Sequence, residues 1–381
     1  MTKHPMSPRE RMLTALGRGV PDRVPATVHQ WQAYHLKHFL GGRSDLEAFR
    51  YFGLDAAISV FDANQGLTTP EWQVESRCYP LEDGNPRRTP LQFEGTGGNF
   101  RLEYTITTPE GVLTQLDEGN EQTTWTVKEL IKRPEDMLLV KKYLPVPRLD
   151  HTIVRARQQA LGDGGILRGF VFGEQGGPWQ QACCLYGTQR MIYATFDDPA
   201  WVHELLRALT DKKLQYIEQS LAGAPFDLVE TGGGAASSTV ISPKIFKNFC
   251  LPYDRQLHDA LHSVGHKVVY HTCGGMMAIL DLIVQNGCDA SETLSPEAVG
   301  GDAVPAEIKR RIGDRVCLIG GLDQINILTG GTPDEVRCAV LRLFETFGPG
   351  GGYMLCVSDH FFEAPPENLR AYAEAARECV Y

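Results

Sequence analysis

The sequence predicts an α/β fold whose main unit is a single (β/α)8 barrel, or TIM barrel. In the second half of the chain, short apolar segments rich in β-branched residues alternate with amphipathic helical segments. Two further apolar segments near the N-terminus bring the expected strands to eight. The sequence lacks a glycine-rich G-x-G-x-x-G fingerprint after an early strand, which disfavours the alternative of an open doubly wound sheet.

The expected strands are short and continuously apolar, as parallel strands are when both of their faces are buried. They cover residues 23–29, 56–62, 166–173, 227–233, 267–273, 290–294, 316–322 and 353–359. The expected helices between and after them include 199–221, 243–264, 278–286, 305–312 and 333–347. Two helices follow the pairs Ser242-Pro243 and Thr332-Pro333, which place a capping side chain before a first-turn proline. The repeated strand–helix–strand order implies parallel pairing with right-handed crossovers.

Residues 86–127 interrupt this alternation. The stretch FRLEYTITTPEGVLTQLDE has a period of two on both sides of a Pro-Glu-Gly turn, which is the pattern of a β-hairpin. We therefore expect a hairpin insertion on one end of the barrel. No linker divides the chain, so residues 1–381 are expected to form one domain.

The composition limits the class of partner. Asp and Glu total 47 against 37 for Lys and Arg, and the formal net charge of −10 argues against nucleic acid, because a phosphate backbone requires a basic surface. The sequence contains no run of 18 apolar residues, so no membrane span is predicted. The N-terminus lacks the apolar core of a signal peptide. We expect a cytoplasmic protein whose ten cysteines are thiols or metal ligands. The oligomeric state is left open.

The working residues of a (β/α)8 barrel are expected at the C-terminal ends of its strands. His271 and Cys273 end one strand, and their spacing of two places both side chains on the same side of the sheet. Imidazole and thiolate suit Zn²⁺, and three protein ligands leave one position open. Cys356 is the preferred third ligand because it lies near the C-terminal end of the last strand. Cys317 and Cys288 compete, but they lie at the opposite ends of their strands.

Other strand ends supply further polar side chains. Glu230 is a hypothetical fourth metal ligand or base, and Asp323 a hypothetical orienting group at the catalytic site. The alternative for Glu230 is a strand-end carboxylate satisfied by backbone amides. The alternative for Asp323 is a plain loop residue. Five residues are assigned to a substrate pocket or to the barrel mouth: His29, Trp31, Trp179, Asp359 and His360.

Several segments carry a resemblance to a known family. They are 9–11 (RER), 21–25 (PDRVP), 131–136 (IKRPED), 241–243 (ISP) and 271–274 (HTCG), together with Cys356. In these segments the chain resembles the uroporphyrinogen decarboxylase superfamily, and within it the zinc-dependent, corrinoid-linked methyltransferases, such as methylcobalamin:coenzyme M methyltransferases. Residues 27–34 (TVHQWQAY) replace the decarboxylases' R-Q-A-G-R-Y stretch, and LCVSDH replaces their N-L-G-H-G segment. Loss of the arginine anchors for substrate carboxylates points away from porphyrin decarboxylation.

The resemblance implies a methyl transfer between a corrinoid (cobalamin) carried by a partner protein and a small methylated or methyl-accepting compound. Zn²⁺ on His271, Cys273 and Cys356 would activate the heteroatom that loses or gains the methyl group. The direction of transfer and the compound are left open. Two alternatives are a metal-free carboxy-lyase like uroporphyrinogen decarboxylase and a non-catalytic subunit that binds a corrinoid protein.

Overall fold

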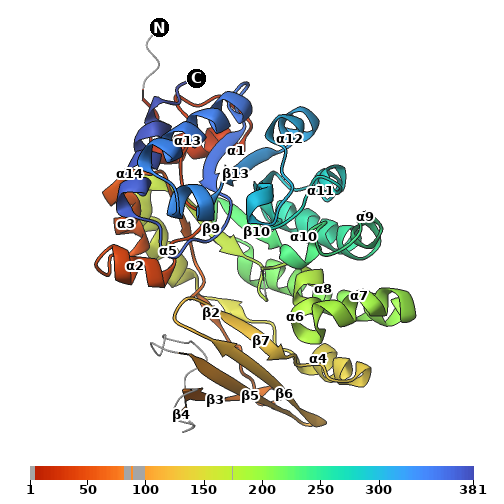
Figure 1. Cartoon of the computed structure of the whole chain (residues 1–381). Coiled ribbons are helices and arrows are strands. Elements are labelled where there is room, and N and C mark those ends of the chain that lie inside the picture. Colours follow the sequence, from red (N-terminus) through yellow and green to blue (C-terminus); the bar gives the residue numbers. More distant parts are fainter. Residues whose placement is uncertain (1–4, 81–86, 89–98, 174) are drawn as a thin grey trace.

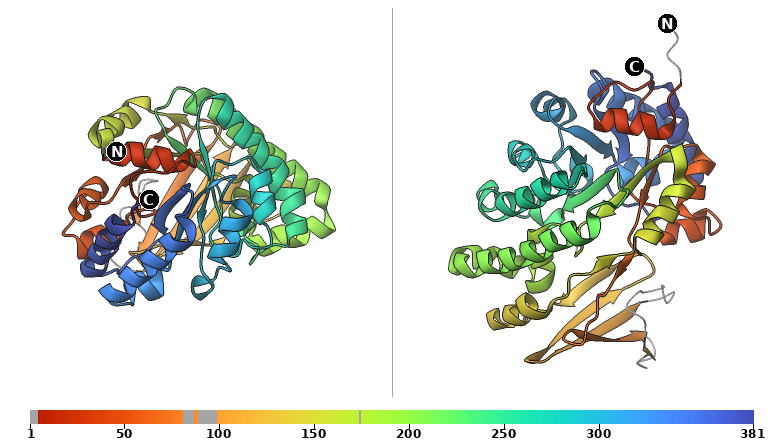
Figure 2. Two further views of the ribbon diagram at one scale, coloured as in Figure 1. Left: turned by 90° about the horizontal axis from the view of Figure 1, so that it is seen from above. Right: turned by 180° about the vertical axis from the view of Figure 1, so that it is seen from behind.

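The computed structural model describes residues 5–80, 87–88, 99–173 and 175–381. Its main unit is a seven-stranded parallel sheet in the order β1-β9-β10-β11-β12-β13-β14. These strands are β1 (Ala56–Ser59), β9 (Gly165–Phe170), β10 (Leu228–Gly232), β11 (Val268–His271), β12 (Ala290–Thr293), β13 (Cys317–Leu322) and β14 (Tyr353–Val357). Each overlaps one of the apolar segments expected to be strands, and β9 begins one residue before its segment. The sheet curls, with helices on its outer side (Figures 1 and 2).

The eighth expected strand, residues 23–29, lies between the two ends of this sheet. Ala26 forms a parallel bridge with Leu355 of β14. On its other side, the N–H of Asp55 donates to the carbonyl of Ala26 over 2.8 Å. Pro25 has no N–H to donate, which limits regular pairing in this segment. The segment closes the barrel without forming a regular strand.

The helices lie in the places that the amphipathic segments indicate. Ser242 accepts a hydrogen bond from the N–H of Ile245, and Thr332 forms a capping box with Glu335. Segments 199–221 and 243–264 are helical with one π-helical turn in each, Ile217–Leu221 and Phe246–Cys250. The helices are α1 (Pro8–Leu16), α2 (Ala33–Phe39), α3 (Asp45–Phe52), α4 (Met137–Tyr143), α5 (His151–Leu161), α6 (Pro178–Tyr186), α7 (Thr188–Asp197), α8 (Pro199–Tyr216), α9 (Pro243–Ile245), α10 (Leu251–Ser263), α11 (Leu280–Gln285), α12 (Pro305–Ile312), α13 (Pro333–Phe347) and α14 (Pro366–Glu378).

The insertion is a five-stranded antiparallel sheet in the order β4-β3-β5-β6-β7. Its strands are β3 (Gln73–Pro80), β4 (Arg87–Arg88), β5 (Phe100–Thr108), β6 (Gly111–Gly119) and β7 (Thr124–Lys128). β5 and β6 form the expected hairpin. The sheet begins at Gln73 rather than near residue 86, because β3 contains few large apolar residues and lacks the continuous apolar pattern of the barrel strands. Within the expected range, residues 86 and 89–98 lie outside the described residues.

The insertion lies at the end of the molecule away from both termini (Figure 1). The chain enters it after β1 and returns through β8 (Arg148–Leu149), which pairs with β2 (Asn64–Gln65), before α5 begins. Because it follows the C-terminal end of a barrel strand, the insertion belongs to the end of the barrel where the strands' carboxyl ends meet.

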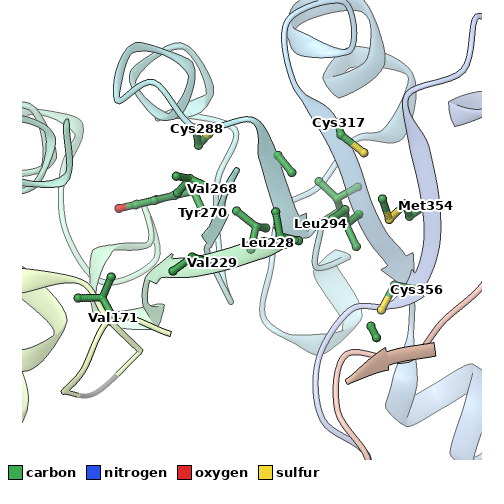
Figure 3. Packing of buried hydrophobic residues seen from close by; sticks show 14 of the residues in the cluster. Val171, Leu228, Val229, Val268, Tyr270, Cys288, Leu294, Cys317, Met354 and Cys356 are labelled. Carbon is green, nitrogen blue, oxygen red and sulfur yellow. The ribbon is translucent and has the colours of Figure 1, made fainter. Parts of the chain in front are cut away.

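The core consists of apolar side chains between the sheet and the surrounding helices. Figure 3 shows Val229 and Val268 from adjacent strands within this layer, and both are fully buried. None of the helices in the described part of the chain is long and apolar enough to cross a membrane.

Candidate active site

A group of buried charged side chains lies inside the barrel. Arg168 of β9 donates from Nη2 to Oε2 of Glu230 on β10 over 2.8 Å. The same nitrogen lies 2.8 and 2.9 Å from the two carboxylate oxygens of Glu292 on β12. All three residues are at most 3% exposed. Buried charges persist only when they are paired, so this guanidinium and these carboxylates depend on one another.

Glu230 was predicted from the sequence as a site residue, whereas Arg168 and Glu292 were not. Each of these two is a single charged residue within an apolar strand, in ILRGFVFG and ASETL. A charge in a strand buried on both faces was the available signal, because such a residue needs a partner inside the barrel.

The two carboxylates differ in electrostatic environment. Burial raises the pKa of Glu230, and repulsion from Glu292 raises it further. Burial also raises the pKa of Glu292, but the positive charge of Arg168 outweighs this effect and holds that pKa well below its usual range. Glu292 is therefore the carboxylate that stays ionised.

His271 joins this charged group through the register of the sheet. His271 on β11 pairs directly with Glu292 on β12, and its Nδ1 lies 3.1 Å from Oε1 of Glu292. Its Nε2 is buried without a hydrogen-bond partner in the described part of the chain. Burial lowers the pKa of His271, but the charges of Cys273, Glu292 and Glu230 raise it well above the usual value. This negative field favours a cation at the imidazole.

Ligand atoms of His271, Cys273 and Asp359 lie within 4.8 Å of one another. Cys273 follows the end of β11, and Asp359 follows the end of β14. The expected pair His271 and Cys273 is thus brought together. Asp359, assigned from the sequence to the barrel mouth, is the third member of this group.

Cys356 lies outside this group of ligand atoms. It is part of β14, opposite Gly321, and is 2% exposed (Figure 3), with Glu292 and Arg168 among its charged neighbours. Burial raises the pKa of its thiol well above the usual value. The predicted ligand set of His271, Cys273 and Cys356 therefore stays a prediction, and Asp359 is an alternative third ligand from the turn after β14.

Two more histidines extend the cluster toward the cavity. The ring of His29 lies 5.0 Å from that of His271 and 5.0 Å from that of His360, measured between centroids. Nε2 of His360 is 3.1 Å from Oε1 of Gln30. Burial and the neighbouring His29 lower the pKa of His360 to about 4. His29, Asp359 and His360 form a second set of ligand atoms within 4.8 Å of one another.

A cavity of about 380 Å³ adjoins the cluster. Its polar side includes His29, Glu230 and His360. The apolar lining includes Phe61, Phe170, Phe172 and Phe226, of which Phe61 and Phe170 stack with centroids 4.4 Å apart. A cavity with one apolar wall and one polar wall orients a small organic compound with its reacting end toward the polar groups.

Three residues assigned to the site from the sequence are not among the residues that line this cavity. Trp31 packs against three phenylalanines of the core. Trp179 is buried, and its Nε1–H donates to the carbonyl of Ala235 over 2.9 Å. Asp323 caps the π-helical turn that follows β13, since its carboxylate accepts from the N–H groups of Ile325 and Asn326 over 2.9 and 2.7 Å. These contacts hold the three side chains within the packed part of the protein.

A β/α barrel with buried acidic, basic and potential metal-binding side chains at one end has the architecture of an enzyme. The family model "Uroporphyrinogen decarboxylase (URO-D)" matches residues 114–379. The chain belongs to the uroporphyrinogen decarboxylase family.

The relatives include decarboxylases and methyltransferases. The chain is 25% identical over 389 aligned residues to the uroporphyrinogen decarboxylase of Coxiella burnetii (strain Dugway 5J108-111), covering 97% of this chain and 94% of that protein. It is 29% identical over 207 residues to the methylated-thiol--coenzyme M methyltransferase of Methanosarcina mazei, covering 53% of this chain and 51% of that protein. A solved methyltransferase from Methanosarcina mazei superposes with a TM-score of 0.63, 15% identity and coverage of 98% and 99%.

These comparisons confirm the family that the sequence motifs indicate. The structural match confirms the predicted barrel fold, since at this identity it speaks for the fold alone. The methyltransferase among the relatives supports that branch of the family, while the decarboxylases match over more of the chain.

Proposed function

We propose that the protein is a zinc-dependent methyltransferase that moves a methyl group between a corrinoid on a partner protein and a small methylated or methyl-accepting compound. The observation that carries this proposal is the group formed by His271, Cys273 and Asp359. In this group a buried imidazole nitrogen without a partner faces a thiol and a carboxylate. A methyltransferase among the relatives supports the same reaction class.

The residues present suit zinc. Nitrogen, sulfur and carboxylate oxygen are its usual ligands, and three protein ligands leave a position for a substrate atom. Glu292 accepts the Nδ1–H of His271 and thereby directs Nε2 toward the metal position, as carboxylates do at many metal-bound histidines. Bound Zn²⁺ supplies Lewis acidity toward the heteroatom that carries or receives the methyl group.

The chain's own groups account for substrate binding and orientation. The phenylalanines hold the apolar part of the compound, while Glu230 and His360 line the opposite wall. Arg168 keeps Glu292 in place through two contacts with its carboxylate. Glu230 is proposed as the carboxylate that meets the substrate beside the metal.

The corrinoid is assigned to a partner protein because of its size. A corrinoid ring with its side chains is much larger than the cavity of about 380 Å³. Its cobalt therefore has to approach from outside, over the barrel mouth, where the metal ligands lie.

A decarboxylase is the second candidate, because the Coxiella burnetii relative of that name matches 97% of the chain. A substrate with several carboxylates needs cationic anchors. Among the described residues, the cavity lining contains no lysine or arginine. The nearby Arg168 is already paired with two carboxylates. This charge distribution favours methyl transfer.

The experiment incubates zinc-loaded protein with methylcobalamin or cob(I)alamin and a panel of thiols, methylated thiols, methylamines and methyl ethers. Cobalt absorbance follows the methyl exchange. We expect exchange with at least one compound, its loss in Cys273→Ala and its retention in Cys338→Ala, which alters an exposed cysteine on α13. Absence of exchange with every compound, together with decarboxylation of uroporphyrinogen, would overturn the proposal.

A further inference from the structure

We propose that the barrel mouth binds a second divalent cation, held by His29, Asp359 and His360, beside the one proposed for His271, Cys273 and Asp359. This inference goes beyond methyl transfer and does not depend on it. It begins from the position of Asp359, which belongs to both sets of ligand atoms. A carboxylate has two oxygens, and one carboxylate commonly bridges two metal ions about 3.5–4 Å apart.

His360 is held in the tautomer that binds a metal through Nδ1. Its Nε2 lies 3.1 Å from Oε1 of Gln30, an oxygen that only accepts, so Nε2 carries the hydrogen. The lone pair is then on Nδ1, which lies 3.6 Å from Oδ1 of Asp359. Gln30 therefore acts on His360 as Glu292 acts on His271, by fixing one ring nitrogen as the donor and freeing the other.

His29 lies near the same carboxylate as His271, beyond hydrogen-bond distance but close enough for charge attraction. Its Nδ1 lies 3.8 Å from Oε1 of Glu292, so the ionised carboxylate favours the hydrogen on that nitrogen. Nε2 is then available as a ligand. Glu292 thus lies near one imidazole of each proposed metal site, and His271 and His360 each have one nitrogen within hydrogen-bond distance of an acceptor.

The charge around the cluster also favours a second cation. Glu230, Glu292 and Asp359 contribute three carboxylates, and Arg168 contributes one guanidinium. A thiolate at Cys273 adds further negative charge. Buried or half-buried carboxylates are stabilised by nearby cations, which favours metal binding beside Asp359.

The second site is accessible and chemically suitable. His29 and His360 both line the cavity, through which an ion and its waters can enter. Two imidazoles and a carboxylate suit Zn²⁺, Co²⁺, Mn²⁺ or Fe²⁺. Ligand positions not filled by the protein would face the cavity and take water or a substrate oxygen.

Cobalt titration of metal-free full-length protein distinguishes the two sites. Co²⁺ bound by Cys273 gives a near-ultraviolet thiolate charge-transfer band, whereas Co²⁺ bound by His29, Asp359 and His360 gives only weak visible bands. We expect wild-type protein to bind two equivalents. His360→Gln should lose one equivalent and keep the charge-transfer band, whereas Cys273→Ala should keep one equivalent and lose that band. His262→Gln, on the outer helix α10, is the control and should bind two.

Saturation of the wild-type protein at one equivalent that carries the charge-transfer band would overturn the second site. Unchanged cobalt binding in both His360→Gln and His29→Gln would overturn it as well. Because His360 is half-exposed, the first variant is expected to fold normally, and a circular dichroism melt checks this. Failure of methyl transfer would leave these binding results unchanged, so the two proposals fail independently.

Discussion

Glu292 lies 3.1 Å from Nδ1 of His271, because the two residues are direct neighbours in the register of β11 and β12. The same carboxylate is held by Arg168 from β9, on the other side of β10. Three strands of the barrel therefore fix the direction of one imidazole before any metal ion arrives. A preorganised ligand loses little conformational freedom on binding, which favours a tight metal site.

Glu292→Gln tests this orientation. The amide keeps the shape of the carboxylate but removes its charge, so we expect zinc affinity at the first site to fall about 10–100-fold. Competition titration with a chromophoric chelator measures the affinity. Glu297→Gln, which changes an exposed carboxylate nearby in the sequence, should leave it unchanged. Equal affinity in the Glu292 variant and the wild type would show that this carboxylate does not orient the ligand.

Arg168→Met tests the buried charge group. The change leaves Glu230 and Glu292 together without their guanidinium, and we expect the free energy of unfolding to fall by about 3–5 kcal/mol. Arg157→Met is the control, because Arg157 pairs with Asp62 at the surface, where an ion pair contributes about 1 kcal/mol or less. Urea denaturation measures both variants. A loss below about 1 kcal/mol in Arg168→Met would mean that the carboxylates are compensated in another way.

The buried side chain of His258 should make the free energy of unfolding sensitive to acid. Its Nδ1–H donates to the carbonyl of Asn286 over 2.9 Å, and its Nε2 accepts from the Thr231 hydroxyl over 2.7 Å. Burial lowers the pKa of His258 from 6.5 to about 4. Because the unfolded chain takes up this proton first, stability is full above about pH 6.5 and falls as the pH drops toward 4, by about 3 kcal/mol in total.

His258→Gln removes this titration. The variant is expected to be less stable than wild type at pH 7, but its unfolding free energy should depend less steeply on pH between about 6.5 and 4. Urea denaturation of both proteins at several pH values gives the two slopes. If the slopes coincide, His258 is not a source of the acid sensitivity.

The variant Phe61→Ala tests whether the cavity binds the substrate. The Phe61 side chain is 52% exposed and stacks on Phe170, so its removal costs the fold little. Loss of one aromatic wall is expected to raise the KM for the small substrate about 10-fold, equivalent to about 1.4 kcal/mol, without a comparable change in kcat or Tm. Phe196→Ala, at an exposed phenylalanine on α7, is the control. An unchanged KM in Phe61→Ala would place the substrate elsewhere.

Much of the barrel could be predicted because its strands are continuous apolar segments and several of its helices begin at Ser-Pro or Thr-Pro pairs. Residues 23–29 were expected as a regular strand, but Pro25 lacks the N–H that the ladder needs. β3 was not predicted, because it contains few large apolar residues and belongs to a sheet outside the barrel.

The site was partly predictable. His271 and Cys273 followed from their spacing at a strand end, which places two side chains on one face. Arg168 and Glu292 were not predicted. Their two segments were assigned as strands, and the need of each buried charge for a partner was not considered. Cys356 was preferred over Cys317 and Cys288 as the third ligand, and Asp359 was assigned only to the mouth, because the position of a side chain at the mouth depends on where β14 ends. That boundary, at Val357, is not fixed by sequence to within one or two residues.

The sulfur count at the zinc ion tests the central claim most directly. X-ray absorption at the zinc edge, on His360→Gln protein so that only the first site is filled, reports the ligands of that ion. The account predicts one sulfur at about 2.3 Å, from Cys273, with the remaining ligands nitrogen or oxygen at about 2.0–2.2 Å. Two sulfurs would place Cys356 in the metal site instead of Asp359, and no sulfur would contradict the proposed zinc centre altogether.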